Sequence, residues 1–289
     1  MGFHYLAISA LFYLFLIGSH ARDRSQNTPF PKALQNLAKP GVWIEGKTTH
    51  AKVGDKKLDV DVYNKAGGNL NDKLFQTDFF LEHDLRQGKV MSLHFTKPSD
   101  EFTFLPHEVA KSIPFSSSKY SELLNHFGIE AKSAEAETVK FTLEVCEKPG
   151  IKGEDKYCTT SLESLIDFTV SKLGKNIRVV STELEKETQK KQQYRIAEGV
   201  QKVGGRAVVC HKLNYPYAVF YCHEVHATRA YTVPLVASDG SKAKALAVCH
   251  TDTRIWHKKN LAFEVLKVQP GTVPVCHFLA TDTLLWVPN

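Results

Sequence analysis

The alternation of hydrophobic and polar positions divides this chain of 289 residues into three stretches. Residues 5–18 form an apolar run, which is shorter than a comfortable membrane span. Residues 22–76 are polar, carry several prolines and the Gly67-Gly68 pair, and contain only short β-like runs such as 58–63. That composition is typical of a poorly ordered leader. Regular periodicity begins later, and we expect one folded domain from residue 77 to residue 289.

Helical periodicity dominates the first half of the expected domain. Residues 106–113, 118–127 and 161–173 have the spacing of short helices. Ser118 or Ser121 would cap the second of these. We expect five apolar residues to lie on or near the buried side of the third helix, namely Leu162, Leu165, Ile166, Phe168 and Val170.

Two further segments fit more than one type of element. Residues 133–146 follow a helical pattern, but alternating apolar residues between 139 and 145 also suit a strand. Residues 260–268 suit either a strand or a short helix.

Alternation with a period of two prevails after residue 174 and predicts a run of β-strands. Together with an early strand at 90–95, the expected strands are 177–180, 193–196, 207–211, 218–225, 230–236, 245–250, 274–278 and 284–287. Helices followed by a mostly antiparallel β-sheet define an α+β fold.

The amino terminus bears on the compartment. The apolar run is followed by Ser19 and Ala21, small residues placed for cleavage after Ala21, so we expect a signal peptide at 1–21 and no membrane association after its removal. Secretion would place the six cysteines in an oxidising compartment, where three disulfides are expected. The turn-rich loop between Cys146 and Cys158 makes these two the favoured local pair.

Charge changes this picture only slightly. The formal net charge is +6, which favours acidic partners such as an acidic cell-wall polysaccharide. The basic residues are dispersed rather than gathered into an arm, so we do not expect nucleic acid as a partner.

The strongest chemical pattern is a Cys-His dipeptide that occurs four times near the carboxyl terminus. Adjacent residues on a strand point to opposite faces of the sheet, so the cysteines can face one way and the histidines the other. Oxidised cysteines would then leave a cluster of imidazoles, which suit copper, zinc or nickel. The alternative is that the histidines are structural hydrogen-bonding groups. The four dipeptides are Cys210-His211, Cys222-His223, Cys249-His250 and Cys276-His277.

Turn residues from Asn214 to Tyr217 would fold the first two dipeptides into a hairpin and bring His211 near His223. His226 and His257 lie close enough in sequence to serve as additional ligands. The chain has no Gly-x-Ser-x-Gly elbow, P-loop or His-Glu-x-x-His motif, and we assign no catalytic residue.

The sequence resembles the plant BURP-domain proteins over about residues 77–289. The resemblance is carried by the opening Phe79–Leu85, by 104–116, by the pair Cys146 and Cys158, by the spacing of the Cys-His dipeptides, and by the closing Trp286-Val287-Pro288. It implies a secretory-pathway protein of the cell wall or vacuole, with a role in seed development or stress response. It also implies a metal site, with copper expected and zinc the alternative, at His211, His223, His250 and His277.

Some members of the family are copper-dependent oxidative peptide cyclases, which crosslink aromatic residues of a core peptide. The nearest core-like string here is Lys39–Trp43, which is shorter and lacks the glutamine. Trp43 would be the crosslinked residue if such chemistry occurred. The segment Thr49–Gly54 instead resembles a repeat unit of the dehydration-responsive subfamily. Three interpretations therefore stay open: a copper-binding protein, a structural wall protein that interacts with pectin without catalysis, and a cyclase.

Overall fold

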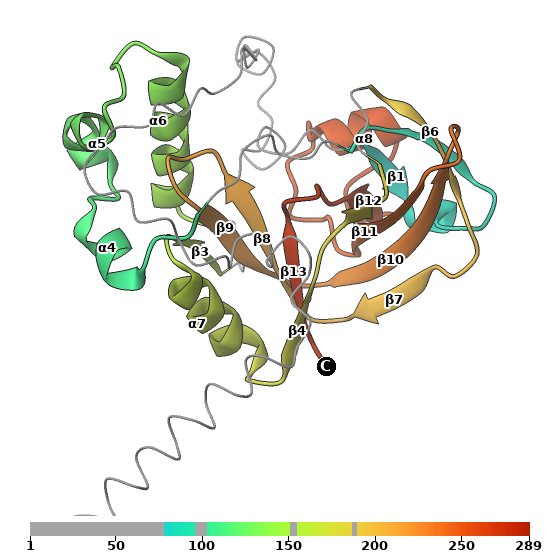
Figure 1. The fold of residues 1–289 in the computed structure, drawn as a ribbon. Helices are drawn as coiled ribbons and strands as arrows, with labels where there is room; N and C mark the ends of the chain where they lie inside the picture. Colours follow the sequence, from blue (N-terminus) through green and yellow to red (C-terminus); the bar gives the residue numbers. More distant parts are fainter. Residues whose placement is uncertain (1–77, 96–102, 151–154, 187–189) are drawn as a thin grey trace, which may run out of the picture.

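The computed structural model describes residues 78–95, 103–150, 155–186 and 190–289. The expected signal peptide, the leader and Trp43 lie outside the described residues. Figure 1 shows the helices α4, α5 and α6 gathered to one side of the small sheet that contains β8 and β9, with α7 beneath it. The long strands β10 and β11 curve through a second sheet on the other side.

The helical elements follow the order that the sequence predicts. Their bounds are η2 (Glu82–Asp84), α4 (His107–Ser112), η3 (Ser117–Lys119), α5 (Tyr120–Phe127), α6 (Ala134–Glu147), α7 (Leu162–Leu173) and α8 (Leu261–Leu266).

The strands form two sheets in which every pairing between described strands is antiparallel. The smaller sheet has the order β3-β9-β8-β13-β4. Its strands are β3 (Lys156–Thr159), β4 (Ile177–Val180), β8 (Ala207–Leu213), β9 (Val219–Val225) and β13 (Leu284–Pro288).

The larger sheet follows the path β1-β12-β11-β10-β6-β2, with β5 paired to β11 and β7 paired to β10. Its strands are β1 (Phe79–Leu81), β2 (Val90–Leu93), β5 (Glu183–Leu184), β6 (Gln192–Ile196), β7 (Gln201–Gly204), β10 (Thr228–Ala237), β11 (Lys242–His250) and β12 (Val275–Phe278). The expected α+β class, with helices before antiparallel strands, is confirmed. The strands are divided between two sheets, which the alternation alone did not reveal.

Helix caps explain how the ambiguous segments resolve. The Ser133 side chain accepts a hydrogen bond from the amide of Ala136, and α6 runs from that cap as a helix. The Asn260 side chain accepts from the amide of Ala262 in the same way, so 260–268 contains a short helix and no strand. These caps satisfy amide groups that the first turn leaves without helical partners.

The expected helix cap is wrong, whereas the expected buried side of α7 is right except at one residue. Neither Ser118 nor Ser121 caps the helical stretch; Ser116 does so, by accepting from the amide of Ser118 at the start of η3. In α7 the expected apolar side is largely confirmed: Leu165 is fully buried, and Leu162 and Phe168 pack partly buried against the same cluster. Ile166 is the exception, because it is 37% exposed, and Thr169 is buried in addition.

The strands near the centre of the fold are buried on both faces. On β8 and β13, Cys210 and Trp286 face the cluster that α7 covers. Their neighbours Val209 and Leu285 face the other way, into a core shared with Leu246 of β11. This shared core holds the two sheets together, because it draws apolar side chains from both. A separate aromatic-rich cluster fills the opposite face of the larger sheet.

Three disulfides tie the elements, and the expectation of a disulfide-stabilised fold is confirmed. Cys146 of α6 pairs with Cys158 of β3. The other two bridges, Cys210–Cys222 and Cys249–Cys276, each join neighbouring strands. A bridge of this kind stabilises a fold by about 2–4 kcal/mol.

The opening motif 79–85 has a structural role. The Glu82 carboxylate accepts hydrogen bonds from Arg229 and from the Tyr231 hydroxyl, each at 2.6 Å. Asp84 accepts from the amide of Leu81 and forms an ion pair with Lys89 at 2.7 Å. These contacts anchor the start of the domain to β10 and to the edge of the larger sheet.

Tyr217 contrasts with Tyr231. Among the described residues, the buried hydroxyls of Tyr215 and Tyr217 have no hydrogen-bond partner, and burial raises the pKa of Tyr217 to about 12. Tyr217→Phe should therefore keep or slightly raise the free energy of unfolding, because no protein hydrogen bond is lost. Tyr231→Phe, the matched control, should lower it by about 1 kcal/mol. Urea denaturation measures both, and an equal loss in the two variants would contradict the assignment.

Candidate metal centre

All four Cys-His dipeptides lie on β-strands, in two equivalent arrangements. Cys210 of β8 stands directly opposite Cys222 of β9. Cys249 of β11 stands directly opposite Cys276 of β12. Each pair of facing cysteines forms a disulfide with a Cα–Cα distance of 3.9 Å.

On each of these strands the histidine projects from the face opposite to the one that carries the disulfide. Register places His211 opposite Tyr221, and His223 opposite Val209, so the two imidazoles are diagonal neighbours. Their ring centroids are 5.4 Å apart, with an angle of 23° between the ring planes. His250 and His277 repeat this arrangement in the larger sheet, at 5.6 Å and 20°.

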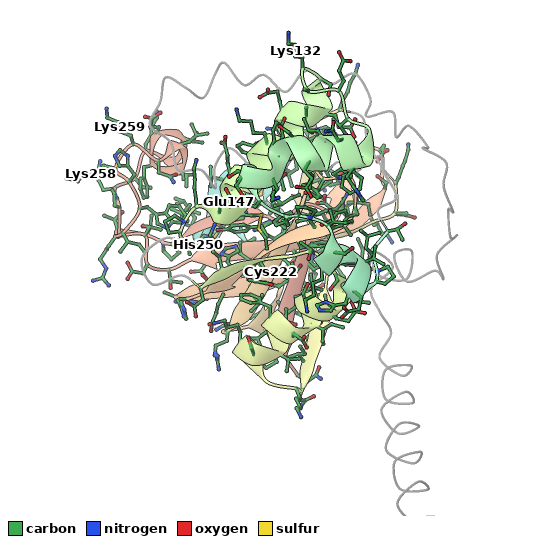
Figure 2. All side chains as sticks on the ribbon, turned by 90° about the vertical axis from the view of Figure 1, so that its left-hand side faces the viewer. Lys132, Glu147, Cys222, His250, Lys258 and Lys259 are labelled. Atoms are coloured by element: carbon green, nitrogen blue, oxygen red, sulfur yellow. A yellow bond between two sulfur atoms is a disulfide. The ribbon has the colours of Figure 1, made fainter. Side chains whose placement is uncertain are left out.

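Both histidine pairs border the core between the two sheets. Val209 lies two residues before His211 on β8, and Val248 lies two residues before His250 on β11, and both valines belong to that core. Because residues two apart on a strand share a face, the histidines continue this face toward the edge of the core. Figure 2 shows His250 and Cys222 within the side chains of the domain rather than at its rim.

Burial determines the electrostatics of the cluster. Burial, reinforced by repulsion from the other three histidines, lowers the pKa of His211 well below its usual range. Burial and the neighbouring imidazoles lower the pKa of His250 to about 3. Burial also lowers the pKa of His277, to about 4, despite its hydrogen bond to the Phe278 carbonyl. These three imidazoles are therefore neutral near pH 7, which is the form that binds metal ions.

Polar contacts orient three of the rings through Nδ1. His277 Nδ1 lies 3.2 Å from the carbonyl oxygen of Phe278 and must donate to it, which leaves Nε2 with the lone pair. His211 Nδ1 lies 3.4 Å from the Thr283 hydroxyl, and His250 Nδ1 lies 3.5 Å from the Thr228 hydroxyl. Such contacts to the second ring nitrogen fix the orientation of metal-binding histidines in other proteins.

Aromatic side chains enclose the cluster. Trp256 packs against His250 with ring centroids 5.0 Å apart, and Tyr221 lies 5.5 Å from His223. Phe79 approaches His277 edge-on at 6.2 Å. Trp256 and Phe79 thus contribute to the desolvation that lowers the pKa values of His250 and His277.

The donor set fits a metal ion in its chemistry and in one of its spacings. His211 Nε2 and His223 Nε2 are 3.3 Å apart, which matches the ~3.3 Å separation of two nitrogens on one tetrahedral ion with metal–nitrogen bonds of about 2.0 Å. With the side chains placed as they are, no three His, Cys, Asp or Glu residues of the described ranges group closely enough to hold an ion. Binding by all four histidines would require the pairs to approach each other.

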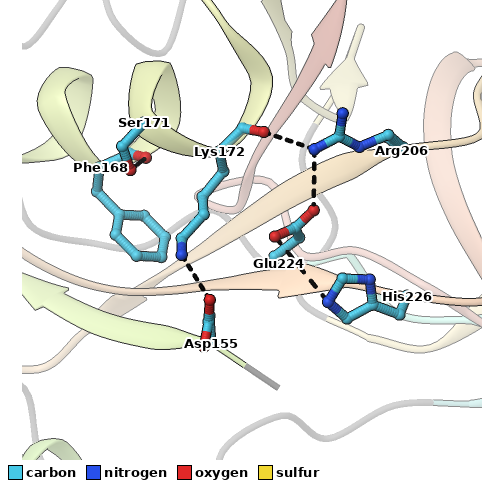
Figure 3. A network of polar contacts seen from close by, with 7 residues as sticks. All are labelled: Asp155, Phe168, Ser171, Lys172, Arg206, Glu224 and His226. Atoms are coloured by element: carbon cyan, nitrogen blue, oxygen red, sulfur yellow. Dashed lines mark hydrogen bonds and ion pairs between the residues drawn. The ribbon is translucent and has the colours of Figure 1, made fainter. Parts of the chain in front are cut away.

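The additional ligands considered from sequence lie elsewhere. His226 is exposed and pairs with Glu224 at 3.9 Å. Figure 3 shows His226 and Glu224 in a network that continues through Arg206 and the Lys172 carbonyl, and in which the Lys172 ammonium meets Asp155. The ring of His257 accepts from the amide of Lys259 in an exposed loop. Thr228, Thr283 and Trp256 contact the histidines, and no spacing in the sequence pointed to them.

The fold and this site define a two-sheet domain in which cross-strand disulfides back paired histidines. Residues 78–288 match the BURP domain family, and the chain belongs to that family. It is 50% identical over 233 residues to the BURP domain protein RD22 of Arabidopsis thaliana, covering 78% of this chain and 59% of that protein.

Two other relatives extend the comparison. The chain is 44% identical over 248 residues to the BURP domain-containing protein 3 of Oryza sativa, covering 83% of this chain and 57% of the relative. It is 37% identical over 300 aligned positions to the embryonic abundant protein VF30.1 of Vicia faba, covering 100% of this chain and 97% of the relative. The matched regions thus span less than two thirds of the first two relatives and nearly all of the third.

The lowered histidine pKa values predict acid sensitivity of the metal-free protein. The unfolded chain takes up protons on histidine near pH 6.5, whereas folded His277 and His250 do so only at about 4 and about 3. The unfolded state then binds more protons within this interval, so the free energy of unfolding should fall as the pH drops below about 6.5.

Urea denaturation in EDTA between pH 7.5 and 5 measures this effect above the range in which unfolded carboxylates titrate, at about 4. His250→Gln should flatten the profile, because it removes one of the buried imidazoles whose pKa is lowered. A parent profile that is level across this interval would refute the prediction.

Proposed function

We propose that this chain is a secretory-pathway BURP-domain protein that binds copper through His211, His223, His250 and His277. The observation that carries the proposal is the repeated pairing of imidazoles, one pair on each sheet, with two Nε2 atoms 3.3 Å apart. A purely structural role for the histidines would not require both sheets to present the same pair beside the same core.

The donor chemistry favours copper over the alternatives. All six cysteines are in disulfides, which removes the thiolate ligands of common structural zinc sites. Neutral imidazoles then form the donor set, and affinity for such nitrogen donors rises to Cu(II) along the first-row divalent ions. Zinc is the competing ion, since it accepts the same donors in tetrahedral geometry. Bound copper would supply a one-electron oxidant.

The disulfides also support the proposed compartment. Three bridges suit the oxidising conditions of the secretory pathway, and the wall or the vacuole is the proposed destination. Among the helices of the described residues, none combines the length and apolar character needed to span a bilayer.

The proposed biological role is seed development or stress response. It is supported by the similarity to the embryonic abundant protein of Vicia faba, which covers nearly the whole length of both chains. A second candidate is a structural wall protein that binds acidic polysaccharide. It is favoured by the formal charge of +6, to which residues 22–76 contribute ten basic and six acidic side chains.

Calorimetric titration of the metal-free mature chain with Cu(II) tests the copper site. We expect binding at micromolar affinity or tighter, with nitrogen hyperfine structure in the electron paramagnetic resonance spectrum. Combining His211→Gln with His250→Gln should weaken binding at least about tenfold, because one ligand is removed from each pair. His226→Gln and His257→Gln are matched controls on exposed histidines. Absent binding, or equal binding by all variants, would rule out the site.

Copper loading should not by itself crosslink the leader. The string Lys39–Trp43 is the only core-like segment and is incomplete. After incubation with Cu(II) and O₂, a proteolytic peptide containing Trp43 should keep its unmodified mass. A loss of two hydrogens from that peptide would instead establish the cyclase interpretation.

A further inference from the structure

Residues 251–268 form most of the connection from β11 to β12 and pack against His250, one histidine of the pair on the larger sheet. The inner side of this segment is packed: Trp256 contacts His250, and Phe263 belongs to a small buried cluster with Phe79 and Val275. Helix α8 is therefore fixed in place by a core of its own. The outer side of the same segment can then present its side chains from a rigid support.

That outer side is unusually apolar. Among the described residues seven large hydrophobic side chains are exposed, and three of them lie in this segment. Ile255 and Val265, at 65% and 56%, are the two most exposed of all seven, and Leu261 is 38% exposed. Leu261 and Val265 are four residues apart on α8 and so share one face of the helix. Single exposed apolar residues are ordinary, but a group on one short segment indicates an interaction surface.

The same segment carries cations without counterions. Lys258, Lys259 and Lys267 are exposed and have no acidic partner among the residues that the structure describes. Arg254, by contrast, is neutralised by Asp252 through a contact of 2.6 Å. Figure 2 shows Lys258 and Lys259 pointing outward at one edge of the molecule.

The charge of this segment is large for its length. Residues 251–267 hold four basic and two acidic side chains, whereas all of 78–289 holds 27 basic and 25 acidic ones. The excess of basic over acidic side chains in this short segment equals the excess in the entire domain. An acidic ligand would therefore meet an attractive field here.

We propose that this basic-apolar surface, formed by Ile255, Lys258, Lys259, Leu261, Val265 and Lys267, docks an acidic polypeptide segment with aliphatic side chains between its carboxylates. Such a segment matches both properties at once, because its carboxylates pair with the lysines while its aliphatic groups cover Ile255, Leu261 and Val265. The surface lies on the outer side of the segment that packs on His250, and its binding requires no metal ion.

Other acidic ligands match the surface less well. A polyuronate has carboxylates but no aliphatic side chains, so it would leave the exposed apolar residues uncovered. An anionic membrane would need a broader apolar face than the single six-residue helix α8 offers. The polypeptide is the ligand class that uses both the lysines and the exposed apolar residues of the surface.

Fluorescence anisotropy with a labelled synthetic peptide of alternating Glu-Glu and Leu-Leu pairs tests the proposal on the full mature chain in EDTA. We expect micromolar binding at low salt that weakens as salt is added. Combining Lys258→Gln with Lys259→Gln should weaken it by roughly tenfold, and combining Ile255→Ser with Val265→Ser by a similar factor. All four positions are exposed, and circular dichroism with a melting curve confirms that each variant folds.

Val109→Ser and Lys111→Gln on α4 are matched controls, at another exposed apolar residue and another exposed lysine. All of these variants keep the charged residues of the leader. If affinity falls only in the Lys258/Lys259 and Ile255/Val265 double variants, binding is assigned to this surface. Absent binding, or equal loss in the controls, would overturn the proposal. The proposal would also be overturned if polygalacturonate or phosphatidylserine vesicles bound as tightly as the peptide and if their affinity did not change in the variant that combines Ile255→Ser with Val265→Ser.

Discussion

Strand register is the constraint on which the rest of this structure depends. Side chains alternate along a strand, so a slip of one residue would turn every histidine toward the wrong face. The bridges Cys210–Cys222 and Cys249–Cys276 prevent such a slip, because a disulfide between directly opposed residues allows only one alignment of its two strands. Pairing of the imidazoles on the opposite faces follows from that alignment, as does their contact with the core between the sheets.

Desolvation accounts for both the packing and the chemistry of the histidine cluster. The apolar residues Val209, Val248 and Leu285 bring the two sheets together, and the same exclusion of water keeps the neighbouring imidazoles neutral. A neutral buried imidazole costs stability in acid but retains a lone pair for a metal ion. The groups that we propose as ligands are thus the ones whose burial makes the fold sensitive to pH.

The sequence predicted elements and faces better than it predicted contacts between distant elements. The strand and helix segments could be found because their periods are local. The Cys-His dipeptides predicted that cysteines and histidines would lie on opposite faces of the strands. The division into two sheets could not be found, since it depends on which strands pair over long separations. β1, β3, β5 and β7 were missed because these segments of two to four residues show no clear alternation of polar and apolar residues. Thr228, Thr283 and Trp256 reach the histidines only through the tertiary fold.

The last strand has a consequence for the order in which the chain can fold. β13 lies between β8 and β4 in the smaller sheet, although it follows every strand of the larger sheet in sequence. During synthesis β8 and β4 therefore cannot pair with their shared neighbour until residues 284–288 have been made. The hairpin of β8 and β9 can form early from local contacts, whereas closure of the sheet requires a contact across more than a hundred residues, from Pro288 to Ile177. Non-local pairings of this kind are slow steps in folding, and here the pairing cannot begin until every strand of the larger sheet has been made.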